Sequence, residues 1–114
     1  MTPLTLRLLP GVLAVSRLDP RAGVPAWATR SAFWSVTRTD DELSVVCDED
    51  AVPDGVRAER GWRVLGVEGR LDFALTGILA SLAGPLASAG VSLFAVSTFD
   101  TDYVLVRRER LDDA

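Results

Sequence analysis

Two stretches of the chain share one pattern and align without a gap. FWSVTRTDDELSVVC (residues 33–47) and LFAVSTFDTDYVLVR (residues 93–107) each place a polar, acidic segment between two apolar runs. Aligned directly, they are identical in three columns: Val36 with Val96, Asp40 with Asp100, and Val46 with Val106. Apolar runs of strand length joined by a few polar residues are typical of a β-hairpin. The pattern predicts the same hairpin built twice, by duplication of one small unit, with chance alternation as the alternative.

Strands are expected outside the repeat as well. Residues 4–9 alternate apolar and polar side chains, and residues 61–69 have the composition of a strand. Pro10-Gly11 suits a type II turn, so we expect residues 12–18 to return as the next strand. The prolines and glycine of residues 19–30 favour a loop, with a short helical turn around Trp27.

One amphipathic helix is expected in the second half. Its apolar stripe has three- and four-residue spacing and consists of Leu75, Ile78, Leu79, Leu82 and Leu86. Gly90 is placed to end it. The second half then reads strand, helix, strand, strand, which is a split βαβ unit. The charged, turn-rich residues 48–61 favour a boundary, so we predict an N-terminal half at residues 1–52, with a reduced helix, and a C-terminal domain at residues 57–114.

The specific part of this pattern resembles a known family. TGILASLAGPLASAGVSLFAVSTFDTDYVLV (residues 76–106) resembles the core of an ACT domain, the small regulatory module that binds amino acids in metabolic enzymes. With LLPGVLAV and the first hairpin, the chain is similar to small bacterial proteins with tandem ACT-like halves, related to the ACT domains of a cytosolic arginine sensor of the TOR pathway. The resemblance implies an α+β, ferredoxin-like fold with mainly antiparallel sheets.

An amino-acid ligand has chemical needs that can be matched to residues. Its carboxylate is suited by free amide hydrogens at a helix N-terminus, where Thr76, Gly77 and Ile78 are expected. Its ammonium group is suited by a carboxylate, and Asp72 and Asp102 flank the region where the helix start and the hairpin loop could meet. Each of these residues also has a purely structural interpretation, as a cap, a packing glycine or a solvated loop residue.

The resemblance adds further candidates. It implies that Thr98, Phe99 and Asp102 contact the ligand, with Asp100 beside them, and that residues 72–78 form a loop over it. Leu75 stands where the arginine sensor has an acidic residue, so the resemblance does not imply arginine itself. The corresponding loop of the first hairpin supplies possible counterparts, for which turn formation is the alternative: Thr37, Arg38 and Thr39.

Composition argues against several classes of function. The net charge is −4 and the arginines form no basic stripe, so nucleic acid is not an expected partner. There is no histidine and no lysine, and Cys47 is the only cysteine, so we expect no enzyme, no metal site and no cofactor. Asp100-Thr101-Asp102 fits a phosphatase nucleophile motif, but phosphoryl transfer would need a magnesium site on a longer chain, the sequence has no lysine, and the repeat already explains the motif.

The sequence also gives expectations for the cellular location and the binding partners of the chain. A single cysteine excludes an internal disulfide and fits the cytoplasm. Residues 73–99 are uncharged, but Gly84-Pro85 and Gly90 divide them, so we expect a helix and a strand and no membrane partner. Small residues on one helix face (Gly77, Ser81, Gly84 and Ser88) favour a homodimer. The sequence predicts a regulatory module that binds an amino acid; the alternative is a protein-interaction or dimerisation module without a ligand.

Overall fold

The computed structural model describes residues 6–67 and 93–109, which form two compact units. Unit 1 consists of Met1–Pro10 and Trp62–Ala114, and unit 2 of Gly11–Gly61. The chain therefore passes from unit 1 to unit 2 after Pro10 and returns after Gly61. The predicted N-terminal half (residues 1–52) and C-terminal domain (residues 57–114) stay a prediction.

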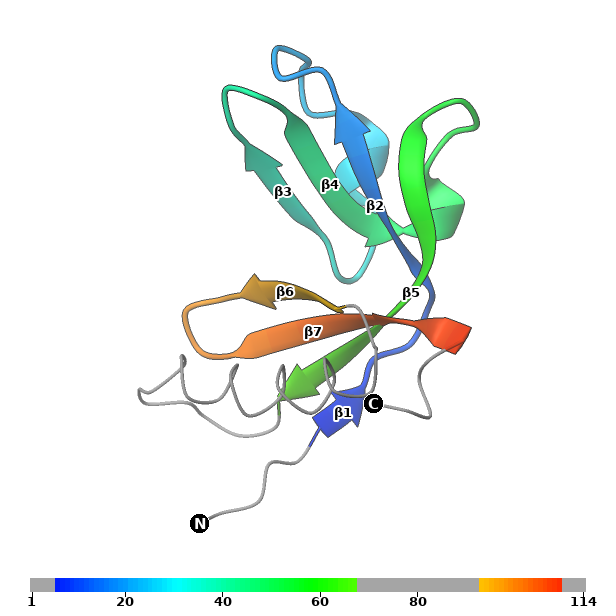
Figure 1. The fold of residues 1–114 in the computed structure, drawn as a ribbon, viewed down its shortest axis with the longest axis vertical. Helices are drawn as coiled ribbons and strands as arrows, with labels where there is room; N and C mark the ends of the chain where they lie inside the picture. Colours follow the sequence, from blue (N-terminus) through cyan, green and yellow to red (C-terminus); the bar gives the residue numbers. More distant parts are fainter. Residues whose placement is uncertain (1–5, 68–92, 110–114) are drawn as a thin grey trace. The chain divides into compact units, whose positions relative to one another are not determined.

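Unit 2 is built on an antiparallel sheet (Figure 1). Its elements are β2 (Leu13–Leu18), the 3-10 helix η1 (Ala26–Thr29), β3 (Ser35–Arg38), β4 (Leu43–Asp48), the 3-10 helix η2 (Glu49–Ala51) and the first part of β5 (Arg57–Val67). Strand β4 pairs with β3 on one side and β2 on the other. One cluster of its buried core contains Ala14, Ala28, Val45, Cys47 and Val52, and Leu13, Leu43 and Val46 are buried as well.

The strands of unit 1 belong to the same seven-stranded sheet, and they come from three parts of the chain (Figure 1). They are β1 (Leu6–Leu8), the end of β5, β6 (Leu93–Ser97) and β7 (Asp102–Arg107). The end of β5 lies between β1 and β7, and β6 pairs with the other side of β7. The guanidinium of Arg107 lies 4.6 Å from the centre of the Trp62 ring, a cation–π contact across β5 and β7.

Most of the strands and the helical turn around Trp27 are confirmed, and the antiparallel character of the sheets is confirmed with them. The return of β2 beside β1 is wrong. Strand β1 pairs with β5, where Leu8 lies opposite Leu65, and the amide of Leu9 donates to the Val64 carbonyl at 2.9 Å. Gly11 does have a positive φ, 92°, but the chain leaves unit 1 there instead of closing a hairpin. The predicted helix lies outside the described residues.

Strand β5 serves both units because it bends at a glycine. Gly61 has φ 82°, a conformation that side chains with a Cβ disfavour, and it is the last residue of unit 2. Its amide donates to Oε1 of Glu49 at 3.1 Å, and the Arg60 guanidinium donates to the Glu49 carbonyl at the same distance. Glu49 thus fixes the strand just before it passes into unit 1.

Candidate functional site

The β3–β4 and β6–β7 hairpins have the same construction. The last pair before the loop is Arg38 with Leu43 in one and Ser97 with Asp102 in the other. Each loop therefore contains four residues, 39–42 and 98–101, and each begins with a threonine. Equal loop length fixes which residues correspond: Leu43 corresponds to Asp102.

Each threonine closes its loop with both its backbone and its side chain. The Thr39 amide donates to the Glu42 carbonyl at 2.9 Å, and the Glu42 amide donates to the Thr39 hydroxyl at 3.2 Å. In the other loop, the Thr98 amide donates to the Thr101 carbonyl at 2.8 Å and the Thr101 amide donates to the Thr98 hydroxyl at 3.3 Å. Thr98, a predicted ligand contact, thus uses its hydroxyl to shape the loop before Asp102.

This geometry corrects the residue correspondence inferred from the sequence. The ungapped alignment has an offset of 60 residues, whereas the strand pairs give 102 − 43 = 59 and 97 − 38 = 59. The structural offset also has three identical columns: Thr39 with Thr98, Asp41 with Asp100, and Val45 with Val104. Sequence comparison favoured the other offset because the true one places an aspartate against a leucine.

Burial follows the same correspondence. Strands β4 and β7 have the same order of buried and half-buried positions along their six residues. Side chains alternate along a strand, so Leu43 shares a face with Val45 and Cys47, and Asp102 shares the equivalent face with Val104 and Val106. Leu43 and Asp102 are both 0% exposed. Asp102 therefore occupies a position that is apolar core in the other hairpin.

The carboxylate of Asp102 is the most unusual group on this face. Both of its oxygens are buried, and within the described parts of the chain neither has a hydrogen-bond partner. Burial of a carboxylate without a partner is strongly unfavourable, because the lost hydration is not replaced. A ligand with a cationic or hydrogen-bond-donating group would supply the missing partner. The start of β7 is thus the candidate binding position.

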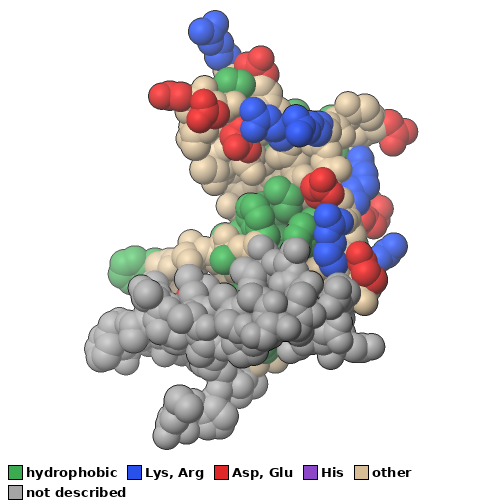
Figure 2. Space-filling model, in the orientation of Figure 1, with side chains coloured by type: hydrophobic (Ala, Val, Ile, Leu, Met, Phe, Trp, Pro, Cys, Tyr) green, Lys and Arg blue, Asp and Glu red, His purple; other side chains and the backbone are tan. Residues whose placement is uncertain are grey.

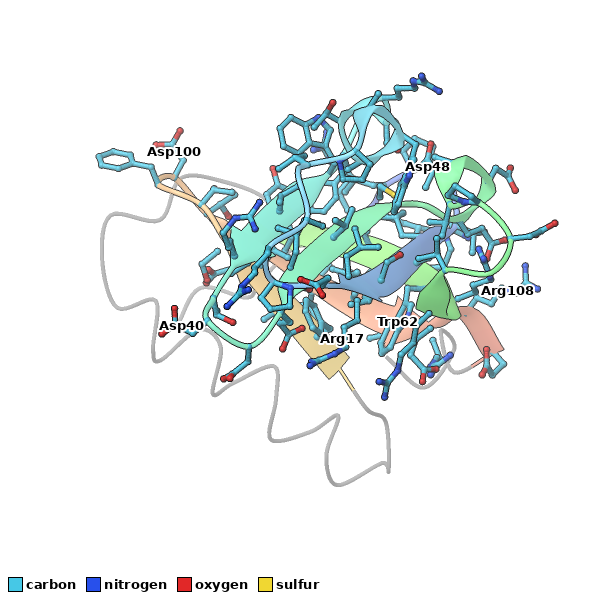
Figure 3. All side chains as sticks on the ribbon, turned by 90° about the horizontal axis from the view of Figure 1, so that it is seen from above. Arg17, Asp40, Asp48, Trp62, Asp100 and Arg108 are labelled. Atoms are coloured by element: carbon cyan, nitrogen blue, oxygen red, sulfur yellow. The ribbon has the colours of Figure 1, made fainter. Side chains whose placement is uncertain are left out.

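The other predicted site residues of this hairpin lie nearer the solvent. Phe99 is 99% exposed, and Asp100 is exposed at the outer end of the hairpin with its side chain pointing away from the sheet (Figure 3). Ser97, which the sequence prediction missed, lies directly opposite Asp102, and opposite residues of an antiparallel pair share a face. Recognising the two threonine-led loops would have placed it there.

The remaining candidates divide into two sets. Five lie outside the described residues, so their predicted role stays a prediction: Asp72, Leu75, Thr76, Gly77 and Ile78. In unit 2, Arg38 donates to the carbonyls of Pro20 and Ala22, and Thr39 closes its own loop. Thr37 is exposed and lies opposite Ser44. These bonds give Arg38 and Thr39 structural roles in unit 2.

The described surface carries charges of both signs. Figure 2 shows arginine and acidic side chains interspersed on the visible face of the described residues. Arg17 and Glu42 form an ion pair with a nitrogen–oxygen distance of 3.3 Å. Within residues 6–67 and 93–109 there is no cluster of three or more potential metal-binding side chains. Among the same residues, none of the helices has the length and apolar character that a membrane crossing requires.

Comparison with protein families settles the assignment of the fold. The profile of the ACT domain matches residues 57–114, and a second profile, described as an N-terminal domain, matches residues 11–55. The chain belongs to the ACT domain family. The predicted α+β, ferredoxin-like ACT fold is thereby confirmed.

Curated relatives and solved structures agree with the ACT assignment. The chain is 32% identical over 94 residues to the human cytosolic arginine sensor for mTORC1 subunit 1, covering 73% of this chain and 29% of that protein. It is 31% identical over 96 residues to human CASTOR3P, of which it spans 59%. A structure from Agrobacterium tumefaciens is 42% identical, with a TM-score of 0.92, over 98% of this chain and 84% of that one.

A more distant structure shares the fold alone. Aspartate kinase from Clostridium acetobutylicum is 12% identical, with a TM-score of 0.59, over 89% of this chain and 30% of that enzyme.

Proposed function

We propose that this chain is a non-catalytic regulatory module that binds an amino acid in unit 1, at the start of β7. The observation that carries the proposal is the carboxylate of Asp102, fully buried with no hydrogen-bond partner among the described residues. An α-ammonium group is a suitable partner, because it combines a positive charge with three donors. The ligand would thus complete an interaction that the described residues leave open.

The rest of the proposed site follows from the chemistry of an amino acid. The ligand's carboxylate would be bound by amides of Thr76, Gly77 and Ile78 at the predicted helix start, with Asp72 and Leu75 beside it. These residues lie outside the described part of the chain, so this half of the site rests on the sequence. Thr98 would hold the loop that leads to Asp102. Phe99 and Asp100 would lie at the entrance of the ligand site.

The relatives support an amino acid as the ligand class. The human relative is named as an arginine sensor, and the solved aspartate kinase is described as an allosteric enzyme. We extend the cytosolic location of the sensor to this chain as part of the proposal. Leu75 leaves the identity of the side chain open, so all twenty amino acids need to be compared.

Thermal unfolding in the presence of each amino acid tests the proposal. An amino acid at a hundred times its dissociation constant adds about 2.7 kcal/mol to the free energy of unfolding, which raises the midpoint by roughly ten degrees. We expect one amino acid or a small related group to do so. Asp102→Ala should abolish the rise, whereas Asp50→Ala, which removes an exposed acid in unit 2, should retain it. A rise that survives Asp102→Ala would place the site elsewhere.

An interaction module without a ligand is the second candidate, favoured by one observation. Phe99 is 99% exposed at the tip of the β6–β7 hairpin, which is unusual for a large apolar side chain and typical of a contact residue. If the contact is a second copy of the chain, Phe99→Ser or Ser81→Arg should lower the mass measured by light scattering. An unchanged mass with both variants would exclude the proposed homodimer at these surfaces.

A further inference from the structure

We propose that the two hairpins have divided roles, so that the chain has one ligand position, in unit 1, and its counterpart in unit 2 is filled by Leu43. Asp102 is then kept at the expense of folding stability. The statement about the ligand rests on the proposed function; the statement about stability does not.

The comparison between the hairpins isolates one difference. Loop length, the loop-closing threonines and the order of buried positions along β4 and β7 are the same. What differs is the pair next to the loop, Arg38 with Leu43 against Ser97 with Asp102. Leu43 is a fully buried apolar residue, whereas Asp102 is a fully buried acid without a hydrogen-bond partner among residues 6–67 and 93–109.

The opposite residue reinforces the difference. Arg38 is engaged in unit 2, because its guanidinium donates to the carbonyls of Pro20 and Ala22. Ser97 is small and exposed, and it leaves the position beside Asp102 without a bulky neighbour across the pair. In the β3–β4 hairpin an apolar side chain therefore fills this position, and in the β6–β7 hairpin a polar side chain occupies it.

The energetic consequence can be stated without knowing the ligand. Asp102 has a buried carboxylate with no partner in the described part of the chain, and replacing it by an apolar side chain removes an unfavourable desolvation and adds apolar burial. The β3–β4 hairpin shows that leucine is compatible with this backbone. A side chain that lowers stability where a more stabilising one fits is typical of a functional position.

Thermal unfolding of the protein without added ligand tests this directly. Asp102→Leu should raise the midpoint by several degrees, and Leu43→Asp should lower it, because it creates the same unpaired acid in unit 2. Asp40→Leu, which removes an exposed acid from the β3–β4 loop, is the matched control and should leave the midpoint nearly unchanged. Asp102→Asn keeps the shape and removes the charge, so it should raise the midpoint less than leucine does.

Two results would overturn the inference. If Asp102→Leu and Asp102→Asn both lower the midpoint or leave it unchanged, Asp102 contributes to the fold as leucine does and is not kept at its expense. The second such result could come from calorimetric titration of the wild-type chain with each of the twenty amino acids. Two equivalents bound per chain would contradict a single ligand position. If no amino acid binds, the proposed function fails, and the unfolding of the leucine variant still decides whether Asp102 lowers stability.

Discussion

The core faces of β4 and β7 carry one buried thiol and one buried carboxylate, and the two need separate explanations. Cys47 is 0% exposed and corresponds to Val106, so it packs as a small apolar residue. Burial raises the pKa of the Cys47 thiol above its ordinary value of 9.0, and the negative charge of Asp48 adds to the rise. Its thiol therefore stays protonated and unreactive in the folded chain.

This shift predicts a dependence of stability on pH. Because the folded thiol holds its proton more tightly than the unfolded thiol, its contribution is fully present below about pH 9 and is lost as the pH rises through the folded pKa. Cys47→Val has no titrating group and takes the residue of its counterpart in β7. The urea midpoint of the variant should therefore fall less steeply than that of the wild type as the pH rises above about 9. Equal slopes would show that the thiol ionises alike in both states.

The two β-hairpins allow the effect of a loop residue on stability to be separated from its effect on ligand binding. Thr39 and Thr98 close equivalent loops with equivalent bonds, but only Thr98 leads to an aspartate. Because both hydroxyls are in exposed loops, each bond contributes at the low end of the range, about 0.5 kcal/mol.

Alanine at each threonine should therefore have matched effects on stability and different effects on binding. Thr39→Ala and Thr98→Ala should lower the free energy of unfolding by similar small amounts. Only Thr98→Ala should weaken the amino-acid-dependent rise of the thermal midpoint, because it loosens the loop that holds Asp102 in register. Equal weakening by both variants would mean that the effect is one of stability alone.

The strands were easier to predict from the sequence than the residue-by-residue correspondence between the two hairpins. Apolar runs on either side of a polar segment were enough to predict β3, β4, β6 and β7, of which β4 and β7 are the buried ones. Alternation could not fix the alignment offset between the two hairpins, because a pattern of period two fits several alignments. In addition, the correct alignment pairs Asp102 with Leu43, and this mismatch makes it look less similar. The pairing of β1 with β5 was missed because it depends on residues far apart in the chain.

At the scale of the whole molecule, the chain forms unit 1 from two separate segments, whereas unit 2 is one continuous segment. The two passages between units occur beside Gly11 and Gly61, both with positive φ. The charged, turn-rich residues 48–61 were visible in the sequence, whereas the positive φ of Gly61 within β5 was not. The candidate site is accordingly made from the part of the chain after the second passage.

Gly61 offers a test of this organisation. Gly61→Ala should lower the free energy of unfolding by about 1–2 kcal/mol, because φ near 82° is disfavoured once a Cβ is present. Gly23→Ala is the control, since a Cβ there would have no atom within 4 Å and no positive φ is required. Urea denaturation compares them. If both alanines have the same small effect, the bend in β5 does not need a glycine.

The most direct measurement of the central claim is an amide NMR titration of the wild-type chain with the amino acid that raises its thermal midpoint. The account predicts that the amides of Ser97, Thr98 and Asp102 shift together on binding. Their counterparts, Arg38, Thr39 and Leu43, should shift little, because that hairpin has no group that awaits a ligand. Shifts centred on the β3–β4 hairpin, or of equal size in both hairpins, would contradict the assignment of the site to Asp102.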